Sequence, residues 1–241
     1  MPDRLLGSDW GDHPVLAEIM DQALGPRMVT IRAADTEGHR SSANILVHSR
    51  YATRGYKTSF ESSASANVVT LIATDRQQTI GTVSMRFDSP SGLLAGDSFP
   101  EEIEQLRARG CRICEFTKLA VDDAVKSKRV LASLFHTAYI WAYRLMGFGA
   151  AIIEVNPRHV RYYERALGFA VIGPERLNRR VDAPAVLLYL DLAQARQHAE
   201  RFAAEAKPSA GERSLYPYFF SAKEEEGIVA RLPRAQEGPK T

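Results

Sequence analysis

The sequence predicts a mixed α/β fold, and three features near its middle indicate it. A strand-like run, Cys111 to Val121, precedes a charged turn, and residues 130–145 then carry apolar side chains at intervals of three and four, which is typical of an amphipathic helix. A second apolar run, Ala150 to Val155, follows, and a further helical segment begins after Asn156. Strand, helix, strand and helix form a βαβ unit with parallel strands, and we expect a functional crevice where these strands separate.

The helix between the two strands has a predicted start and a predicted end. Ser127 can cap its first turn, because a serine hydroxyl accepts hydrogen bonds from free backbone amides. Gly147 and Gly149 can end it, since glycine adopts the left-handed conformation that closes many helices. The apolar run that follows suits a strand that is buried on both faces.

The N-terminal part is expected to add one strand and one helix. Residues 1–26 predict a peripheral segment, which includes a short amphipathic piece around Val15 to Leu24. Met28 to Ala33 alternates and predicts the first strand. A helix is expected from about Ser41 to Thr53, with core contacts from Ile45, Leu46 and Tyr51.

A hairpin and a short helix lead to the central unit. Val68 to Thr74 and Thr79 to Phe87 flank a turn, and this pattern predicts an antiparallel hairpin. Residues 90–100 contain glycine and proline and predict a loop. Glu101 to Arg109 predicts a short charged helix that returns the chain to the central strand.

Beyond the central unit, two more strands are expected before the chain becomes helical. Residues 169–172 predict a strand, residues 174–183 a polar loop, and Pro184 to Leu192 the last core strand. Leu192 to Lys207 is rich in alanine and favours a helix. Ser221 to Leu232 predicts another.

An aromatic cluster, Tyr216 to Phe220, stands between the two predicted C-terminal helices. We expect it to pack back onto the domain. An exposed patch for a partner is the alternative. The residues from Pro233 onward predict a disordered end.

Composition favours one elaborated domain. A chain of 241 residues can bury a substantial core, and its net charge of +2 gives no argument for a nucleic-acid partner. There is no leading apolar segment of signal-peptide form and no apolar run long enough to cross a bilayer. We therefore expect a soluble, cytoplasmic protein without a transmembrane segment.

Cys111 and Cys114 form a Cys-x-x-Cys pair, a spacing that can indicate metal or redox chemistry. A tetrahedral zinc site needs further ligands, and the sequence has no second cysteine pair or His-x-x-x-His cluster. In a regular strand the two side chains also point to opposite faces. We therefore expect reduced packing residues and no metal site.

Four blocks of sequence carry a family resemblance, and they occur in order: Glu115 to Val121, Ser127 to Phe135, Asn156 to Glu164 and Pro184 to Leu188. Together they resemble the Gcn5-related N-acetyltransferase (GNAT) superfamily and, within it, the long-chain N-acyl amino acid synthases, which are relatives of the acyl-homoserine-lactone synthases. The resemblance implies a GNAT-like α+β fold with a central, mixed, mostly antiparallel sheet of about seven strands flanked by helices. It covers a domain of residues 27–193, and residues 194–241 are then a C-terminal helical extension.

Glu115 is the first candidate for the catalytic acid or base. It lies mid-strand among apolar residues, where burial raises the proton affinity of a carboxyl group, although such a residue can also be merely ion-paired. The resemblance matches Glu115 to the glutamate on the acceptor side of these synthases. Glu154, in the other parallel strand, is a second acid candidate that no motif supports.

Lys118 stands where the lactone synthases usually have arginine. Lysine cannot make the planar two-pronged contact of arginine, but its point charge could still hold the carboxylate of an amino-acid acceptor. If Glu115 and Lys118 both face the acceptor, the strand needs a β-bulge between about Phe116 and Ala120, because a flat strand places them on opposite faces.

The remaining candidates surround the expected crevice. In the related synthases the loop after the first helix closes the acceptor pocket, so Arg54 and Tyr56 are candidates, with a solvated arginine beside a packing tyrosine as the alternative. Tyr163 matches the tyrosine that protonates the departing thiol in many GNAT enzymes. The segment is one residue longer than usual, so Tyr162 could face the site instead.

Asn156 and His159 could contact the pantetheine of the donor. Asn156 could equally be only a helix cap. Both residues follow the second parallel strand and lie at its expected mouth.

The donor end differs from that of ordinary coenzyme-A-dependent relatives. Those enzymes hold pyrophosphate with a glycine-rich turn at a helix start, whereas residues 122–129 contain no glycine. The residues that remain are polar or basic and could bind one phosphopantetheine phosphate and the acidic surface of an acyl carrier protein: Lys126, Ser127, Lys128 and Arg129. A solvated run of charge is the alternative.

The resemblance implies an acyltransferase that moves a fatty acyl group from an acyl carrier protein thioester to the α-amine of an amino acid, tyrosine-like, without a metal or a redox cofactor. Acyl-coenzyme A is the alternative donor. The alternative functions are a lactone-synthase-like signal producer, a short-chain acetyltransferase, and a catalytically inactive module that binds the acyl carrier.

Overall fold

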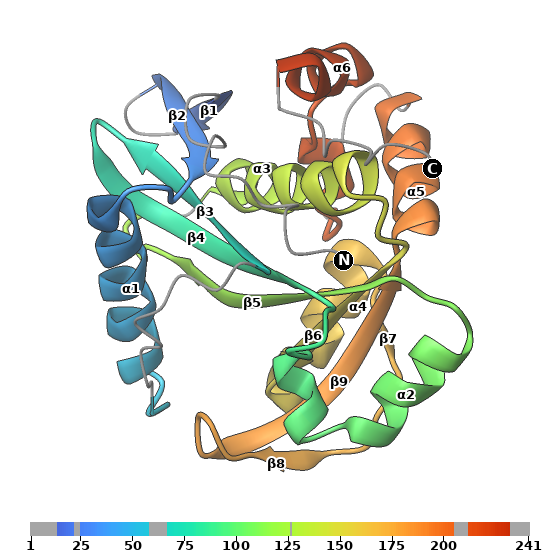
Figure 1. The fold of residues 1–241 in the computed structure, drawn as a ribbon. Helices are drawn as coiled ribbons and strands as arrows, with labels where there is room; N and C mark the ends of the chain where they lie inside the picture. The colour runs from blue at the N-terminus through green and yellow to red at the C-terminus, as the bar shows by residue number, and fades with distance from the viewer. Residues whose placement is uncertain (1–13, 22–24, 58–66, 126, 205–211, 232–241) are drawn as a thin grey trace.

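The computed structural model describes residues 14–21, 25–57, 67–125, 127–204 and 212–231. Within them, nine strands form one twisted sheet in the spatial order β1-β2-β3-β4-β5-β6-β9-β7, and β8 pairs with β9 (Figure 1). The pair β5–β6 is parallel and the other pairs are antiparallel. The strands are β1 (Val15–Asp21), β2 (Gly25–Ala33), β3 (Val68–Asp75), β4 (Gln78–Phe87), β5 (Ile113–Val121), β6 (Ala150–Val155), β7 (Ala170–Val171), β8 (Arg176–Asn178) and β9 (Ala183–Asp191).

Helices cover both faces of this sheet (Figure 1). The α-helices are α1 (Glu37–Ala52), α2 (Pro100–Ala108), α3 (Lys128–Tyr139), α4 (Val160–Leu167), α5 (Leu192–Ala204) and α6 (Ala222–Arg231). Shorter turns are η1 (Leu94–Asp97), η3 (Pro157–His159) and η4 (Tyr216–Tyr218), and the π-helical segment η2 (Ile140–Leu145) continues α3. The predicted GNAT-like α+β architecture is thus confirmed.

The largest hydrophobic core lies between the sheet and α3, and it also includes residues of α4, α5 and α6. A second cluster fills the opposite face below η1 and α2, around Phe99, Ile113 and Ile152. A small third cluster lies under α1. Because alternate residues of a strand face opposite sides, Cys114 and Phe116 join the large core while Glu115 points to the face of α1 and α2.

The N-terminal expectation is wrong for β1. Val15 and Ala17 are buried, and β1 pairs with β2 along its whole length, so this segment is part of the sheet rather than a peripheral piece. The predicted polar loop 174–183 likewise contains a short strand, β8, that pairs with β9. Both strands are too short or too weakly patterned to stand out in the sequence.

The two predicted helix starts also differ in detail. The first helix begins earlier than expected because Thr36 caps it, its hydroxyl accepting a hydrogen bond from the His39 amide at 3.1 Å. Ile45 is 67% exposed, so its predicted core contact is wrong, and Ala43 and Val47 face the sheet instead. Ser127 occupies the cap position of α3, but its side chain makes no capping hydrogen bond.

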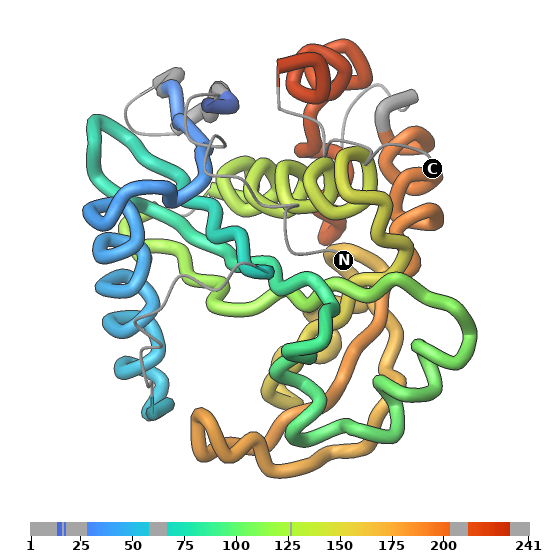
Figure 2. The backbone as a smooth tube through the Cα atoms, viewed as in Figure 1, coloured from blue at the N-terminus to red at the C-terminus, as the bar shows by residue number. Residues whose placement is uncertain are grey.

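The C-terminal segment, residues 212–231, packs back onto the domain as the aromatic cluster predicts. Figure 2 traces the chain to this segment, which lies against α3 and its continuation. Tyr216 and Phe220 are buried, and the Tyr216 hydroxyl donates a hydrogen bond to the carbonyl of Leu167 at 2.7 Å. Both cysteines are free thiols, and Cys114 is fully buried.

Candidate active site

The parallel strands β5 and β6 separate in the middle of the sheet. Their pairing covers three residue pairs, from Ile113 with Ala150 to Glu115 with Ile152, and beyond this point the described residues of the two strands do not pair. We call this gap the split. Parallel strands that diverge leave backbone groups and side chains free to contact a substrate.

A bulge in β5 accompanies the split. Thr82 of β4 faces Ala120, while Ser84 faces Thr117, so two residues of β5 stand opposite one residue of β4. Lys118 lies in this bulge and has a φ of 52°, a left-handed conformation that is uncommon for residues other than glycine. The predicted bulge between Phe116 and Ala120 is therefore confirmed.

A cavity of about 250 Å³ lies at the split and opens toward both faces of the sheet. Glu115, Glu154 and Arg180 line it on the face of α1 and α2, whereas Phe135 and Tyr163 line it on the face of α3. The lining includes the predicted catalytic and substrate-binding residues Glu115, Tyr163, Lys118, Arg54, Tyr56, Asn156 and His159. The fold thus brings together residues from segments that are more than 100 positions apart in the sequence.

Glu115 is almost completely buried in the lining of this cavity. Its side chain is 1% exposed, and its Oε2 accepts a hydrogen bond from the backbone amide of Leu94 at 2.7 Å. Burial, and then the negative charge of Glu154, raise the pKa of Glu115 to about 7, against the lowering effect of the Leu94 amide and Arg180. A carboxyl group with this pKa can exchange protons at neutral pH.

Glu154 lies on the same face of the sheet as Glu115, two residues beyond the last residue of β6 that pairs with β5. Its Oε2 forms an ion pair with Nη2 of Arg180. Burial raises the pKa of Glu154, and Arg180 and Ser98 partly oppose this effect. The side chain is only 7% exposed, so the cavity contains two buried carboxyl groups within electrostatic reach of each other.

Arg180 is a cavity residue that the sequence did not indicate. It follows β8, and its amide donates to Oδ1 of Asn178 at 2.9 Å, which fixes the turn. Its guanidinium also contacts the Leu94 carbonyl and Oδ2 of Asp97, the latter at 2.9 Å. Arg180 therefore ties η1 to β6 across the cavity, and no local motif could have shown it because these contacts are long-range.

Tyr163, rather than Tyr162, lines the cavity. Its ring packs edge-on against Phe135 and Phe169, with centroid distances of 6.4 and 6.1 Å, while Tyr162 is 43% exposed. Burial, followed by the neighbouring Tyr51 hydroxyl, raises the pKa of Tyr163. Its phenol is therefore protonated at neutral pH and can serve as a proton donor.

Tyr56, which follows α1, meets η3 beside the cavity. Nη2 of Arg158 donates to the Tyr56 hydroxyl at 2.9 Å, and the guanidinium lies 5.6 Å from the centre of the Tyr56 ring. Asn156 caps η3, its Oδ1 accepting from the Arg158 amide, so the predicted capping alternative is realised at a residue that also lines the cavity. Burial, and then Arg158 and Arg54, lower the pKa of His159.

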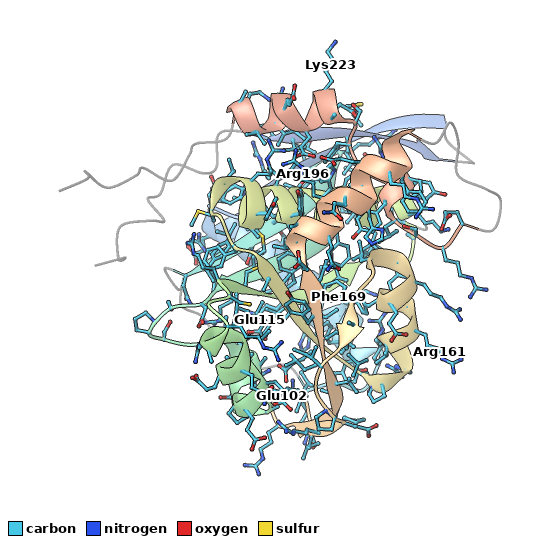
Figure 3. The ribbon with its side chains drawn as sticks, turned by 90° about the vertical axis from the view of Figure 1, so that its right-hand side faces the viewer. Glu102, Glu115, Arg161, Phe169, Arg196 and Lys223 are labelled. Carbon is cyan, nitrogen blue, oxygen red and sulfur yellow. The ribbon has the colours of Figure 1, made fainter. Side chains whose placement is uncertain are left out.

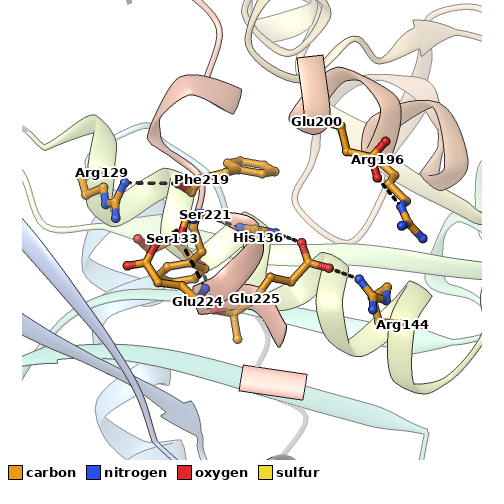
Figure 4. Close-up of polar contacts among 12 residues, drawn as sticks. Arg129, Ser133, His136, Arg144, Arg196, Glu200, Phe219, Ser221, Glu224 and Glu225 are labelled. Carbon is orange, nitrogen blue, oxygen red and sulfur yellow. Dashed lines mark hydrogen bonds and ion pairs between the residues drawn. The ribbon is translucent and has the colours of Figure 1, made fainter. Parts of the chain in front are cut away.

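The basic start of α3 is bound by the C-terminal segment. Nζ of Lys128 donates to the Glu212 carbonyl at 2.7 Å, and Nη1 of Arg129 donates to the Tyr218 carbonyl at 3.0 Å. Nη1 of Arg129 also donates to the Phe219 carbonyl at 3.3 Å (Figure 4). Neither residue lines the cavity, and the same holds for Ser127. Lys126, also expected at the donor end, lies outside the described residues.

Comparison with known proteins identifies the family. Residues 42–191 match the model of the family described as "N-acyl amino acid synthase FeeM", which is more than half of the chain. The chain belongs to the FeeM family. Its members are acyltransferases, and we therefore treat this FeeM-family chain as one.

Solved structures agree with this assignment. FeeM, an N-acyl amino acid synthase from uncultured soil microbes, is 25% identical and superposes with a TM-score of 0.64, over 70% of this chain and 93% of that one. A putative N-acetyltransferase from Lactobacillus plantarum (17% identity, TM-score 0.50, 68% and 98% covered) and Arabidopsis thaliana NAA60 (15%, 0.50, 68% and 98%) share the fold. A search of curated protein sequences gave no match. Within the described residues, the helices are all too short or too polar to cross a membrane.

Proposed function

We propose that this FeeM-family chain transfers a long-chain fatty acyl group from an acyl carrier protein thioester to the α-amine of an amino acid, tyrosine-like. One observation carries the proposal. The cavity at the split joins a face with two buried carboxyl groups to a face with a protonated tyrosine, so an amine and a thioester can meet between β5 and β6.

Each group has a chemical part in amide formation. Glu115 removes a proton from the acceptor's ammonium, and the neutral nitrogen attacks the thioester carbonyl carbon. Backbone amides freed by the bulge around Lys118 are placed to stabilise the oxyanion. As the C–S bond breaks, Tyr163 protonates the sulfur and regains a proton from the new amide nitrogen, while Glu115 releases its proton to solvent.

The lining of the cavity supports a fatty acyl group and an amino-acid acceptor. Apolar side chains from six elements line it, which suits an aliphatic chain: Val47, Val68, Val83, Leu94, Phe116 and Phe135. Cationic side chains also line it, among them Arg54, Lys118 and Arg180. A cation beside two carboxylates matches an acceptor that carries both a carboxylate and an amine.

The carrier would dock on exposed arginines of α4 rather than on the side chains of Lys128 and Arg129, which the C-terminal segment binds. Arg161 and Arg165 lie one helical turn apart on α4, which directly follows η3, and both are exposed. The Arg161 side chain points outward from the protein (Figure 3). Ser127 and the first amides of α3 remain for the phosphate of phosphopantetheine, because helix starts favour anions.

The test compares two donors in a steady-state assay with mass-spectrometric detection of the N-acyl amino acid. Reversing two charges, Arg161→Glu with Arg165→Glu, should raise KM for acyl carrier protein about tenfold and leave a minimal acyl-pantetheine thioester unaffected, because only the carrier offers an acidic surface. Added salt should mimic the loss in the wild type.

The matched control reverses two charges on α6, Lys223→Glu with Arg231→Glu. Lys223 points away from the body of the protein, far from Arg161 (Figure 3), so neither donor should be affected. An equal loss with both donors would remove the arginines from carrier docking. Failure to form any N-acyl amino acid from either donor would reject the proposed function itself.

A further inference from the structure

Glu154 has a buried carboxylate with one oxygen in an ion pair and one oxygen that no described residue contacts by a hydrogen bond. Its Oε2 is paired with Arg180, whereas Oε1 is buried and, among the described residues, has no hydrogen-bond partner. Glu154 lines the cavity, and its side chain is 7% exposed. A carboxylate oxygen that is removed from water without a donor is costly, so such an atom calls for an explanation.

The residues around Glu154 provide a partner for Oε2 but not for Oε1 among the described residues. Arg180 faces it from the turn after β8 and, with Ser98 from the segment before α2, opposes the rise in its pKa, while Asp97 of η1 adds a negative charge. Glu115 is the other acidic group near it, across the split. These contacts orient the side chain, and none of the described residues donates a hydrogen bond to Oε1, which is therefore available to a ligand.

We propose that Oε1 of Glu154 receives the ammonium group of the acceptor and positions it beside Glu115. This inference rests on the proposed function and deepens it, because it assigns separate tasks to the two acids. An ammonium has three N–H donors, and it can therefore donate to Glu154 while Glu115 takes one of its protons. Glu154 transfers no proton in this scheme, its pair with Arg180 favours the charged form, and it acts as a positioning residue.

The arrangement also links amine binding to the ionisation of Glu115. The charge of Glu154 increases the proton affinity of Glu115 in the empty site. A bound ammonium cancels this effect, so Glu115 loses its own proton and becomes a base only when an acceptor is present. The site is thereby matched to cationic acceptors and not to neutral ones.

The test uses the full chain and the variant Glu154→Gln, which keeps the size of the side chain and removes its charge. We expect KM for the amino acid to rise at least tenfold, with kcat and the KM for the acyl thioester within about twofold of the wild type. Titration calorimetry with L-tyrosine and with its analogue that lacks the amine should show a preference for the amine in the wild type and its loss in the variant. The same two titrations with leucine and its des-amino analogue test whether the preference for the amine also holds for an acceptor with a different side chain.

The control is Asp97→Asn, which removes the exposed partner of Arg180 and leaves Glu154 intact. It should change neither the amine KM nor the preference. The proposal is overturned if Glu154→Gln leaves the amine KM unchanged, if Asp97→Asn raises it equally, or if the wild type binds both compounds of each pair with equal affinity. An amine preference that depends on Glu154 in a chain that transfers no acyl group would reject the proposed function and leave this inference standing.

Discussion

Two regions of the molecule carry the charged residues expected at the site, and they differ in what holds those residues. In the split, Glu115 and Glu154 project from strands into a shared cavity, where Leu94 and Arg180 bind them. At the start of α3, the side chains of Lys128 and Arg129 instead contact residues 84 and 89 positions further along the chain.

The direction of a side chain can be predicted for a residue in a paired strand, but not for a long side chain at a helix start. A residue in a strand has its direction fixed by the pleat and by pairing, so Glu115 had to face the cavity once β5 was in register. A long cation at a helix start can bend toward any acceptor within reach. Here the carbonyls of the C-terminal segment provide such acceptors.

The largest expected effect lies in the split. Glu115→Gln should lower turnover roughly a hundredfold or more, because it removes the proton acceptor but keeps an oxygen for the Leu94 amide. Turnover and KM for the amine are measured in the same assay. A loss confined to the amine KM would make Glu115 a binding residue and not the base.

Unfolding measurements on Glu115→Gln show whether the fold is intact. Folding raises the pKa of Glu115 from an ordinary 4.5 to about 7, so the native state binds more protons than the unfolded state between these values. The stability of the wild type relative to the variant should therefore fall as pH rises through this range, by up to about 1.4 kcal/mol per pH unit. The variant should then be no less stable than the wild type at pH 8.

The smallest expected effect on activity lies at α3. Glu225 of α6 accepts from Nε2 of His136 at 3.1 Å and pairs with Arg144 (Figure 4). Glu225→Ala should lower the free energy of unfolding by about 1–3 kcal/mol in urea titrations, because the buried His136 loses its partner, while turnover stays within about twofold. Glu226→Ala, which removes an exposed charge from the next position, is the control.

The contribution of Glu225 to the free energy of unfolding depends on pH in a predictable direction. Burial raises the pKa of Glu225, but its hydrogen bond with His136 and its ion pair with Arg144 outweigh burial and lower this pKa below 4.5. The stabilisation is therefore complete above pH 4.5 and is lost as pH falls through the lower native pKa, so wild type and Glu225→Ala should converge in acid. A large loss of turnover in Glu225→Ala at neutral pH would show that the C-terminal segment shapes the active site.

Local patterns predicted most of the fold and part of the site. The hairpin β3–β4 and the strand β6 follow from alternation and apolar runs. The bulge in β5 follows from the family resemblance, which places both Glu115 and Lys118 near the acceptor. The strand β1 and the contacts of Arg180 did not follow. An edge strand has a weak pattern, and an arginine's partners depend on tertiary packing that no spacing encodes.

The central claim is that Glu115 acts as the base in the split, and its own titration tests this most directly. At saturating donor, kcat/KM of the wild type for the acceptor should fall about tenfold per pH unit below pH 7, since burial and the charge of Glu154 hold the pKa of Glu115 at about 7 in the site without acceptor. Glu115→Gln should retain only its residual rate and lose this acidic limb. An acidic limb that persists unchanged in Glu115→Gln would contradict the claim.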